Sequence, residues 1–308
     1  MGTPDFAVPT LEALAREHDV VLVVAQPDKP AGRGMKLHPP AVVVKARELG
    51  LPLVQPAKVR EALDVVASAR PDLGIVVAYG KILPPSLLAI PARGFLNVHA
   101  SILPRWRGAA PIQRAIEAGD RETGVTIMRV DEQLDHGPTL AIATTPIGDD
   151  EHTPSLASRL SQLGAETLLP ALASAVETPQ DHAQATYAAK IEKSEGEVRW
   201  GESARTIYDR FRAFDPWPGL FTDDWSAGVP PASPGRARDA RAPVKLLDLR
   251  PAEGHAEPGT ILRIDDQVLV ATGDNAIEIL AMQRPGKGRA GAGEVARALG
   301  WRAGARLA

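Results

Sequence analysis

Short β-branched runs alternate with helical patterns through the first half of the chain, and this alternation constrains the fold more than any other feature. Runs at 20–25 and 73–79 are typical of buried strands, while 41–49 and 59–69 carry apolar residues at helical spacing. Strands joined by helical crossovers pair in parallel, so the pattern predicts an α/β domain with a mostly parallel sheet covered by helices. Further strands are predicted at 95–100, 125–130 and 139–146, and further helices at 111–118 and 154–175.

The pattern changes after residue 180. A polar connector leads to a predicted helix at 204–214, and a Pro-Trp-Pro-Gly turn follows at 216–219. Short strands separated by turn residues are then predicted at 244–249, 260–264, 267–271 and 277–282. The Pro-, Gly- and Arg-rich stretch at 228–243 is expected to be an insertion between strands. The sequence thus predicts a first domain at 1–180, a linker at 181–198, and a small antiparallel or OB-like, barrel-like domain at 199–308.

Length and composition are consistent with two domains. The chain has 308 residues, of which 44% are hydrophobic, so each domain can bury its own core. The apolar runs are too short to cross a membrane and no leader pattern opens the sequence, so a cytoplasmic protein is expected. There are no cysteines, which excludes disulfides, cysteine nucleophiles and thiolate metal sites.

Basic residues are concentrated in two segments although the formal net charge is −3. Residues 29–47 contain five Lys and Arg and no acidic residue, and residues 281–308 contain six Lys and Arg with Glu294 alone. Such segments are often only solvated surface. Two of them in one acidic chain favour a polyanionic partner.

The segment 94–104 carries the clearest chemical signal. If it forms a strand, Asn97, His99 and Ser101 lie on one face, and Pro104 ends the strand at the edge of the sheet where α/β proteins bind ligands. An amide donor beside an imidazole suits a reaction in which a carbonyl oxygen gains charge and a proton moves. Taken singly, a histidine in this position is more often a hydrogen-bonded core residue than a functional one, and an asparagine such as Asn97 is more often a turn or cap residue.

A second polar cluster lies at 131–138. Asp135, just before Gly137-Pro138, is explained by position alone as a turn residue. If the loop folds toward His99, the carboxylate could orient the imidazole and stabilise its charged form. No two histidines have the spacing of metal ligands on one element, so the sequence predicts no metal site.

Several motifs resemble those of the folate-dependent formyltransferases. The resemblance is carried by Asn97-Val98-His99, by the run at 101–113 with its Pro-Arg-Trp-Arg-Gly segment, and by Leu134-Asp135-His136-Gly137. It extends to the segments at 2–6, 26–34, 77–80, 213–219 and 283–287. The Asn-x-His element is shared across the superfamily. The Pro-Arg-Trp-Arg-Gly segment and the Gly-Arg-Gly loop are more specific, and they resemble the corresponding segments of the members that formylate a charged initiator tRNA.

The resemblance implies a Rossmann-like catalytic domain, a linker and a barrel-like tRNA-binding domain. It implies that Asn97, His99 and Asp135 are catalytic, with 10-formyltetrahydrofolate as co-substrate and no metal. It further implies that the reduced folate contacts Ser101, Ile102, Leu103 and Pro104. The acceptor would be methionyl initiator tRNA, bound through Arg33, Lys36 and Lys287 by a monomer during translation initiation.

One departure from the family concerns the start of the sequence. Relatives begin with an apolar strand ahead of the Gly-Thr-Pro-Asp-Phe loop, and Met1 occupies the end of that strand here. The first strand is therefore expected to be missing, which predicts a gap in the middle of the sheet and unpaired backbone groups.

Two alternative functions remain at the level of sequence. One is a related formyltransferase that acts on a nucleotide or sugar amine with the same Asn, His and Asp. The other is a non-catalytic RNA-binding protein, for which the basic segments suffice and His99 belongs to the core.

Overall fold

The computed structural model describes residues 1–31, 36–173, 176–222 and 243–307, which form two compact units. Unit 1 comprises 1–112, 121–149 and 155–190, and unit 2 comprises 113–120, 150–154 and 191–308. The insertion predicted at 228–243 lies outside the described residues except for Pro243. Within the described ranges, no helix combines the length and apolar character needed to cross a membrane.

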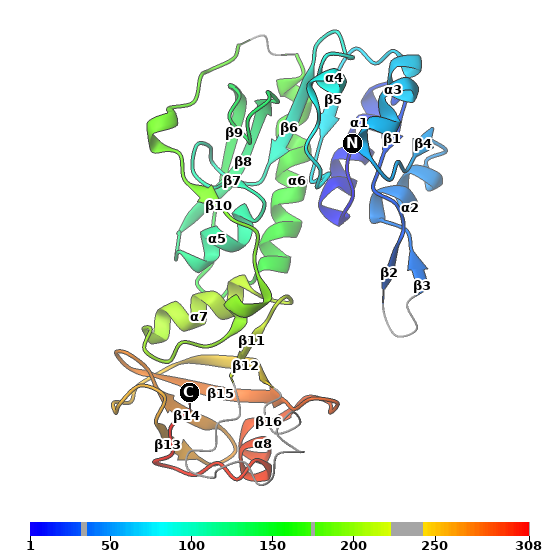
Figure 1. Ribbon diagram of the computed structural model, residues 1–308. Helices are drawn as coiled ribbons and strands as arrows, with labels where there is room; N and C mark the ends of the chain where they lie inside the picture. The colour runs from blue at the N-terminus through cyan, green and yellow to red at the C-terminus, as the bar shows by residue number, and fades with distance from the viewer. Residues whose placement is uncertain (32–35, 174–175, 223–242, 308) are drawn as a thin grey trace. The chain divides into compact units, whose positions relative to one another are not determined.

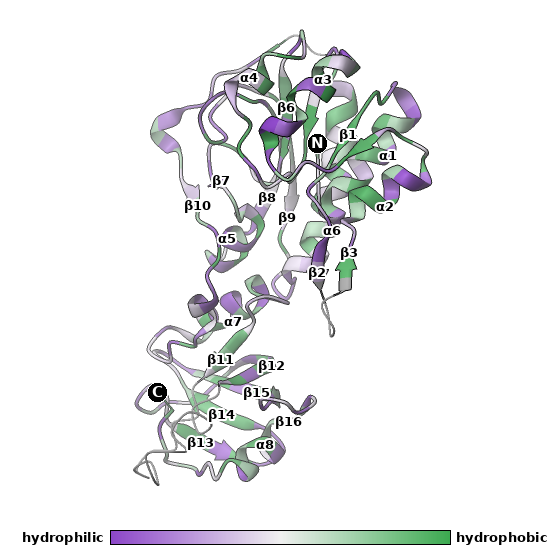
Figure 2. Ribbon diagram, turned by 45° about the vertical axis from the view of Figure 1, so that its right-hand side comes forward, coloured by the Kyte–Doolittle hydropathy of each residue, from purple (hydrophilic) through white to green (hydrophobic). Residues whose placement is uncertain are grey.

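The first half of unit 1 has the predicted alternation of strands and helices (Figure 1). Its elements are α1 (Val8–Glu17), β1 (Val23–Val24), β2 (Lys29–Ala31), β3 (Lys36–His38), α2 (Ala41–Glu48), β4 (Leu53–Val54), α3 (Leu63–Ala69), β5 (Gly74–Val76) and α4 (Pro85–Leu88). β1 pairs in parallel with β4, and β2 pairs antiparallel with β3. Figure 2 shows apolar residues on α1, α2 and β1, where Leu11, Val23 and Val42 share one buried core.

The second half of unit 1 provides most of the sheet. β6 (Phe95–His99), β8 (Glu122–Arg129) and β9 (Thr139–Pro146) continue from β5 in the order β5-β6-β8-β9. β5 and β6 are parallel as predicted, whereas β8 is antiparallel to both neighbours. The loop between β8 and β9 contains no crossover helix, so these two strands can only form an antiparallel pair. α6 (Thr153–Ala171) packs closely on β6, since a Cβ at Gly164 would lie 2.7 Å from Val98.

The sheet of unit 1 is interrupted between β1 and β5, and Met1 and Gly2 lie in the interruption. The amide of Gly2 donates to Val24 over 3.1 Å, and the carbonyl of Met1 accepts from Val77 over 2.9 Å. A cavity of about 580 Å³ continues from Met1 between the residues leading into β1 and those leading into β5. The cavity therefore lies in the interruption between β1 and β5. The hydroxyl of Thr10, which lines this cavity, is buried without a hydrogen-bond partner.

Unit 2 contains an antiparallel sheet, two helices that precede the sheet in the chain, and a helix near the C-terminus. Its elements are α5 (Pro111–Glu117), α7 (Ala204–Ala213), β11 (Leu220–Thr222), β12 (Val244–Ala252), β13 (Ile261–Ile264), β14 (Val268–Ala271), β15 (Ala276–Gln283), β16 (Ala290–Gly291) and α8 (Ala292–Ala298). The strand order is β11-β12-β15-β14-β13, with β16 beside β15. Among the described strands β11 and β13 do not pair, so the sheet is antiparallel as predicted but is not a closed barrel.

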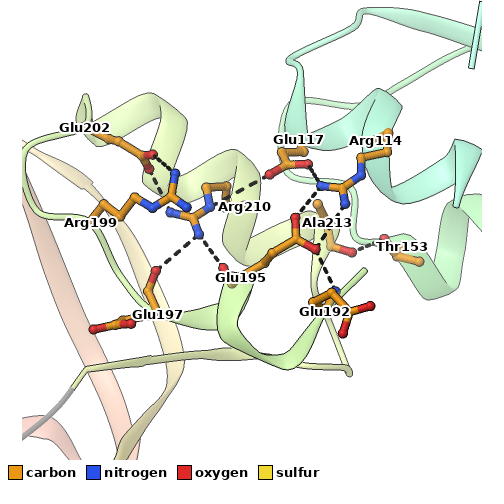
Figure 3. Close-up of polar contacts among 10 residues, drawn as sticks. All are labelled: Arg114, Glu117, Thr153, Glu192, Glu195, Glu197, Arg199, Glu202, Arg210 and Ala213. Carbon is orange, nitrogen blue, oxygen red and sulfur yellow. Dashed lines mark hydrogen bonds and ion pairs between the residues drawn. The ribbon is translucent and has the colours of Figure 1, made fainter. Parts of the chain in front are cut away.

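An ion-pair network connects the helices of unit 2 (Figure 3). Arg210 on α7 is 4% exposed, forms an ion pair with Glu202 at 2.8 Å, and donates to the carbonyls of Glu195 and Glu197. Arg114 on α5 pairs with the carboxylate of Glu195 at 2.7 Å. This bond holds the pKa of Glu195 below its ordinary value. Each of these charges faces a partner of opposite sign, which offsets the cost of removing it from water.

Candidate functional site

Two polar side chains of the proposed site come from β6. Asn97 pairs with Met128 and His99 with Thr126 in the antiparallel register with β8. Leu96 and Val98, which alternate with them, are buried in the core of unit 1. The period-2 pattern therefore separates the polar face of β6 from its apolar face, as the sequence predicts. His99 is 5% exposed, whereas Asn97 is only partly buried.

Asp135 approaches this polar face from the loop between β8 and β9. Its Oδ1 accepts from Asn97 Nδ2 over 3.3 Å, and its Oδ2 accepts from the backbone N–H of Gly108 over 2.8 Å. The same Oδ2 lies 3.6 Å from His99 Nδ1, which is an ion-pair distance rather than a hydrogen bond. The structure thus brings together Asn97, His99 and Asp135, including the proximity that sequence alone could not provide. Asp135 has a φ of +47°, a left-handed conformation that costs a non-glycine residue about 1–2 kcal/mol.

The two ring nitrogens of His99 have different environments. Nε2 lies 2.9 Å from the carbonyl oxygen of Trp106, and a carbonyl can only accept, so Nε2 carries a hydrogen. Nδ1 therefore faces the Asp135 carboxylate. In the neutral imidazole this nitrogen presents a lone pair, and in the imidazolium it presents a hydrogen. The arrangement suits a group that takes up and releases one proton at Nδ1.

The segment predicted to contact folate follows β6 directly. Ser101 is fully buried and its hydroxyl donates to the carbonyl of Arg105 over 2.6 Å. Leu103 is buried too, and its amide donates to Thr126 Oγ1 over 3.1 Å. Ile102 and Pro104 keep part of their surface accessible, and the Leu103–Pro104 peptide is cis. Ser101 and Leu103 thus fix the shape of the segment, while Ile102 and Pro104 are open to contact.

The three residues after Pro104 have distinct environments. The guanidinium of the exposed Arg105 stacks on the ring of Trp106 at 4.3 Å. Arg107 is 2% exposed, and its guanidinium contacts Gln180 and His182. The buried guanidinium of Arg107 thus bonds to an amide and an imidazole. Gln180 and the amide of Gly108 are site residues that the sequence analysis missed, because no local pattern connects them to Asp135.

The residues predicted to bind RNA are described only in part. Arg33 lies outside the described residues, and the side chain of Lys36 is likewise not described. Lys287 is exposed on the turn after β15. Lys45 in the first basic segment forms ion pairs with Glu12 at 3.0 Å and Glu48 at 2.8 Å, so it stabilises α1 and α2 locally. In the described part of the chain, no group of three or more His, Asp or Glu side chains could hold a metal ion.

The fold and site agree with one class of enzyme. Residues 1–172 match the formyl transferase family, and residues 190–300 match the C-terminal domain of formyl transferases. The chain therefore belongs to the formyl transferase family.

Several methionyl-tRNA formyltransferases are similar over nearly the whole chain. The enzyme from Sorangium cellulosum is 45% identical over 294 residues, which cover 93% of this chain and 91% of that enzyme. The enzyme from Thermus thermophilus is 45% identical over 311 residues, covering 99% and 97%. Among solved structures, an N-formyltransferase from Helicobacter canadensis has the same fold, with a TM-score of 0.64 at 14% identity over 90% of this chain and 96% of its own.

Proposed function

We propose that this chain transfers the formyl group of 10-formyltetrahydrofolate to the amino group of methionyl initiator tRNA, for the initiation of translation. The observation that carries the proposal is the convergence of Asn97, His99 and Asp135 in a chain that belongs to the formyl transferase family. Relatives named for this reaction are similar over 99% of the chain, including unit 2. An amide, an imidazole and a carboxylate suffice for acyl transfer to an amine without a metal.

The reaction forms one C–N bond and breaks another. The neutral amine of the methionyl group attacks the formyl carbon, and the carbonyl oxygen becomes an oxyanion on a tetrahedral carbon. Asn97 Nδ2 carries two hydrogens, of which one is directed to Asp135. The other is available to stabilise the oxyanion. Collapse of the intermediate breaks the bond to the folate nitrogen and leaves the formyl group on the amine.

The attacking amine must lose a proton and the departing folate nitrogen must gain one. His99 Nδ1 is the nitrogen available for this transfer, because Nε2 donates to Trp106. Asp135, 3.6 Å away, stabilises the imidazolium that forms when Nδ1 takes the proton. A water molecule between them would complete the path in either direction.

The remaining assignments belong to the same proposal. Reduced folate contacts the segment Ser101, Ile102, Leu103 and Pro104, with Ile102 and Pro104 providing accessible surface. Arg33, Lys36 and Lys287 bind the tRNA, which makes binding salt-sensitive. We assign 1–180 as the catalytic domain, 181–198 as the linker and 199–308 as the barrel-like, OB-like domain that binds tRNA. The enzyme acts as a monomer in the cytoplasm, which light scattering and cell fractionation would test.

Transfer of labelled formyl from 10-formyltetrahydrofolate to methionyl initiator tRNA tests the proposal directly. The parent chain should formylate the tRNA, and His99→Ala should reduce the rate by at least about 100-fold. Folding of both proteins must be verified by circular dichroism. A folded parent chain that transfers no formyl to this tRNA would contradict the proposal.

The two alternative functions predict other results in the same assay. A formyltransferase for small amines would formylate a free nucleotide sugar amine faster than the tRNA. A non-catalytic RNA-binding protein would retain tRNA binding without binding folate, and its binding would be unaffected by His99→Ala.

A further inference from the structure

We propose that Gln180 is a positioning residue that holds Asp135 in its reactive orientation, with Arg107 orienting Gln180 in turn. This inference rests on the proposed function, because it assigns a role through Asp135. All three residues belong to unit 1. Gln180 lies on the segment after α6 and is 8% exposed.

The amide of Gln180 uses all of its hydrogen-bonding capacity. Nε2 donates to the backbone carbonyl of Asp135 over 3.0 Å and to that of Gly137 over 2.7 Å. Oε1 accepts from Arg107 Nε over 3.1 Å and from Arg107 Nη2 over 2.7 Å. Carbonyls only accept and a guanidinium only donates, so only one orientation of this amide satisfies all four bonds. Glutamate in its place could keep the two bonds from Arg107 but would place an oxygen against both carbonyls.

The loop that Gln180 contacts needs an external restraint. Asp135 has a left-handed backbone, and Gly137 packs so closely on Arg129 that a Cβ would lie 2.1 Å from the Arg129 carbonyl. A loop strained at one residue and tightly packed at another keeps its shape only while its surroundings fix it. Gln180 bonds to the carbonyls of these same two loop residues.

Arg107 and its neighbour Gly108 together hold both the backbone and the side chain of Asp135. The guanidinium of Arg107 bonds to Gln180, which bonds to the Asp135 carbonyl, while the next residue, Gly108, donates its amide to the Asp135 carboxylate. Arg107 and Gly108 form β7, which pairs in parallel with β10 (Tyr187–Ala188). The guanidinium of Arg107 also contacts His182, whose Nδ1 lies 2.8 Å from Arg107 Nη2. The backbone carbonyl of Asp135, through Gln180, and its carboxylate, through Gly108, are thereby both connected to β7.

The variant Gln180→Glu tests this inference. It should lower kcat for formyl transfer by about 10–100-fold, since a displacement of about 1 Å at a reacting group costs that much, and leave KM for both substrates within about twofold. In an Asp135→Asn background the same substitution should have no further effect, because the two residues act through one group. Amide hydrogen exchange at 131–138 should accelerate. Gln184→Glu, an exposed glutamine of the same segment that bonds to Asp181, is the matched control and should match the parent chain.

Different results overturn different statements. If Asp135→Asn abolishes transfer but Gln180→Glu retains the parent kcat, the positioning role is wrong and the proposed function stands. Losses that multiply in the double variant would also refute it. If the parent chain itself transfers no formyl, the proposed function fails, and hydrogen exchange at 131–138 still decides whether Gln180 restrains the loop. Should Gln180→Glu not fold, Gln180→Met, which removes all four bonds at similar volume, takes its place with the same expectations.

Discussion

His99 donates its Nε2 hydrogen to the carbonyl oxygen of Trp106 over 2.9 Å, and this bond determines which ring nitrogen is free for chemistry. Trp106 holds a left-handed backbone with a φ of +63°, which directs its carbonyl back toward β6. The Pro-Arg-Trp-Arg-Gly segment thus fixes the tautomer of the His99 imidazole, which lies seven residues before Trp106. The free nitrogen, Nδ1, faces Asp135.

Asp135→Asn should therefore lower kcat by about 10³-fold, because a neutral amide cannot stabilise an imidazolium at Nδ1. The hydrogen bond from Gly108 can persist to the amide oxygen, so stability should change little. Single-turnover formyl transfer gives the rate. Asp131→Asn is the matched control, since Asp131 lies in the same loop and pairs with His136 at 2.8 Å. An equal loss in both variants would show that the loop, and not the Asp135 charge, is needed.

Gly108→Ala should impair both stability and catalysis. Gly108 has a φ of +117°, and a Cβ there would lie 2.8 Å from the carbonyl of Ala188 on β10. Relief of this contact moves the amide that bonds Asp135, so we expect a loss of about 2 kcal/mol and a fall in kcat of about tenfold or more. The control is Gly50→Ala. Gly50 also has a left-handed backbone, but an added Cβ there would meet open space, so this variant should lower stability by about 1 kcal/mol without changing kcat. Urea titrations and steady-state kinetics distinguish the two.

The spacing of apolar residues predicted the helices and strands in which buried residues recur at regular intervals. The strand at 95–100 is observed as Phe95–His99, the helix at 204–214 as Ala204–Ala213, and the strand at 267–271 as Val268–Ala271. Each buries one face against a core, so the pattern of apolar residues contains the information. The strand predicted at 20–25 is shorter, with only Val23 and Val24 in a ladder, because strand pairing is interrupted on its β5 side.

The site was only partly predictable for a related reason. Asn97 and His99 lie two residues apart on one strand, so their common face follows from the strand geometry. Asp135 and Gln180 contact each other although they are 45 residues apart, and this contact depends on how loops close in three dimensions. Gln180 is an ordinary residue in a polar segment. No periodicity or charge pattern distinguishes it from Gln184.

Removing the ion pairs and hydrogen bonds of Arg210 should strongly destabilise unit 2. Arg210→Met should destabilise the unit by about 3 kcal/mol, because Glu202 and two backbone carbonyls lose a buried donor. Arg205→Met on the same helix is the control. Arg205 is about half exposed and pairs with Asp209 at 2.9 Å, so its loss should cost less than about 1 kcal/mol. Equal losses in thermal unfolding would mean that burial of Arg210 contributes nothing.

The buried amino group of Met1 should make the free energy of unfolding depend on pH. Burial lowers its pKa from 8.0 to about 5. The unfolded chain therefore binds more protons than the folded chain between these two values, and stability should fall as pH decreases from about 8 to about 5. The full difference is about 4 kcal/mol at most. Denaturation midpoints of the chain with a free and with an acetylated Met1 should diverge over this range, and parallel curves would show that the amine stays hydrated.

Filling the cavity ahead of Met1 should stabilise unit 1. Met1 already accepts from Val77 and Gly2 donates to Val24, so a segment joined to Met1 would continue between β1 and β5 in the same register. Roughly five residues would span the distance lined by 18–22 and 69–74. A Val- and Ile-rich extension buries apolar side chains and moves the amine into solvent, which should raise the free energy of unfolding by about 3 kcal/mol after the cost of ordering the added residues. A Gly-Ser extension of equal length moves the amine without filling the cavity. If both extensions shift the urea midpoint equally, the gain comes from the amine alone, and the space between β1 and β5 does not accept a strand.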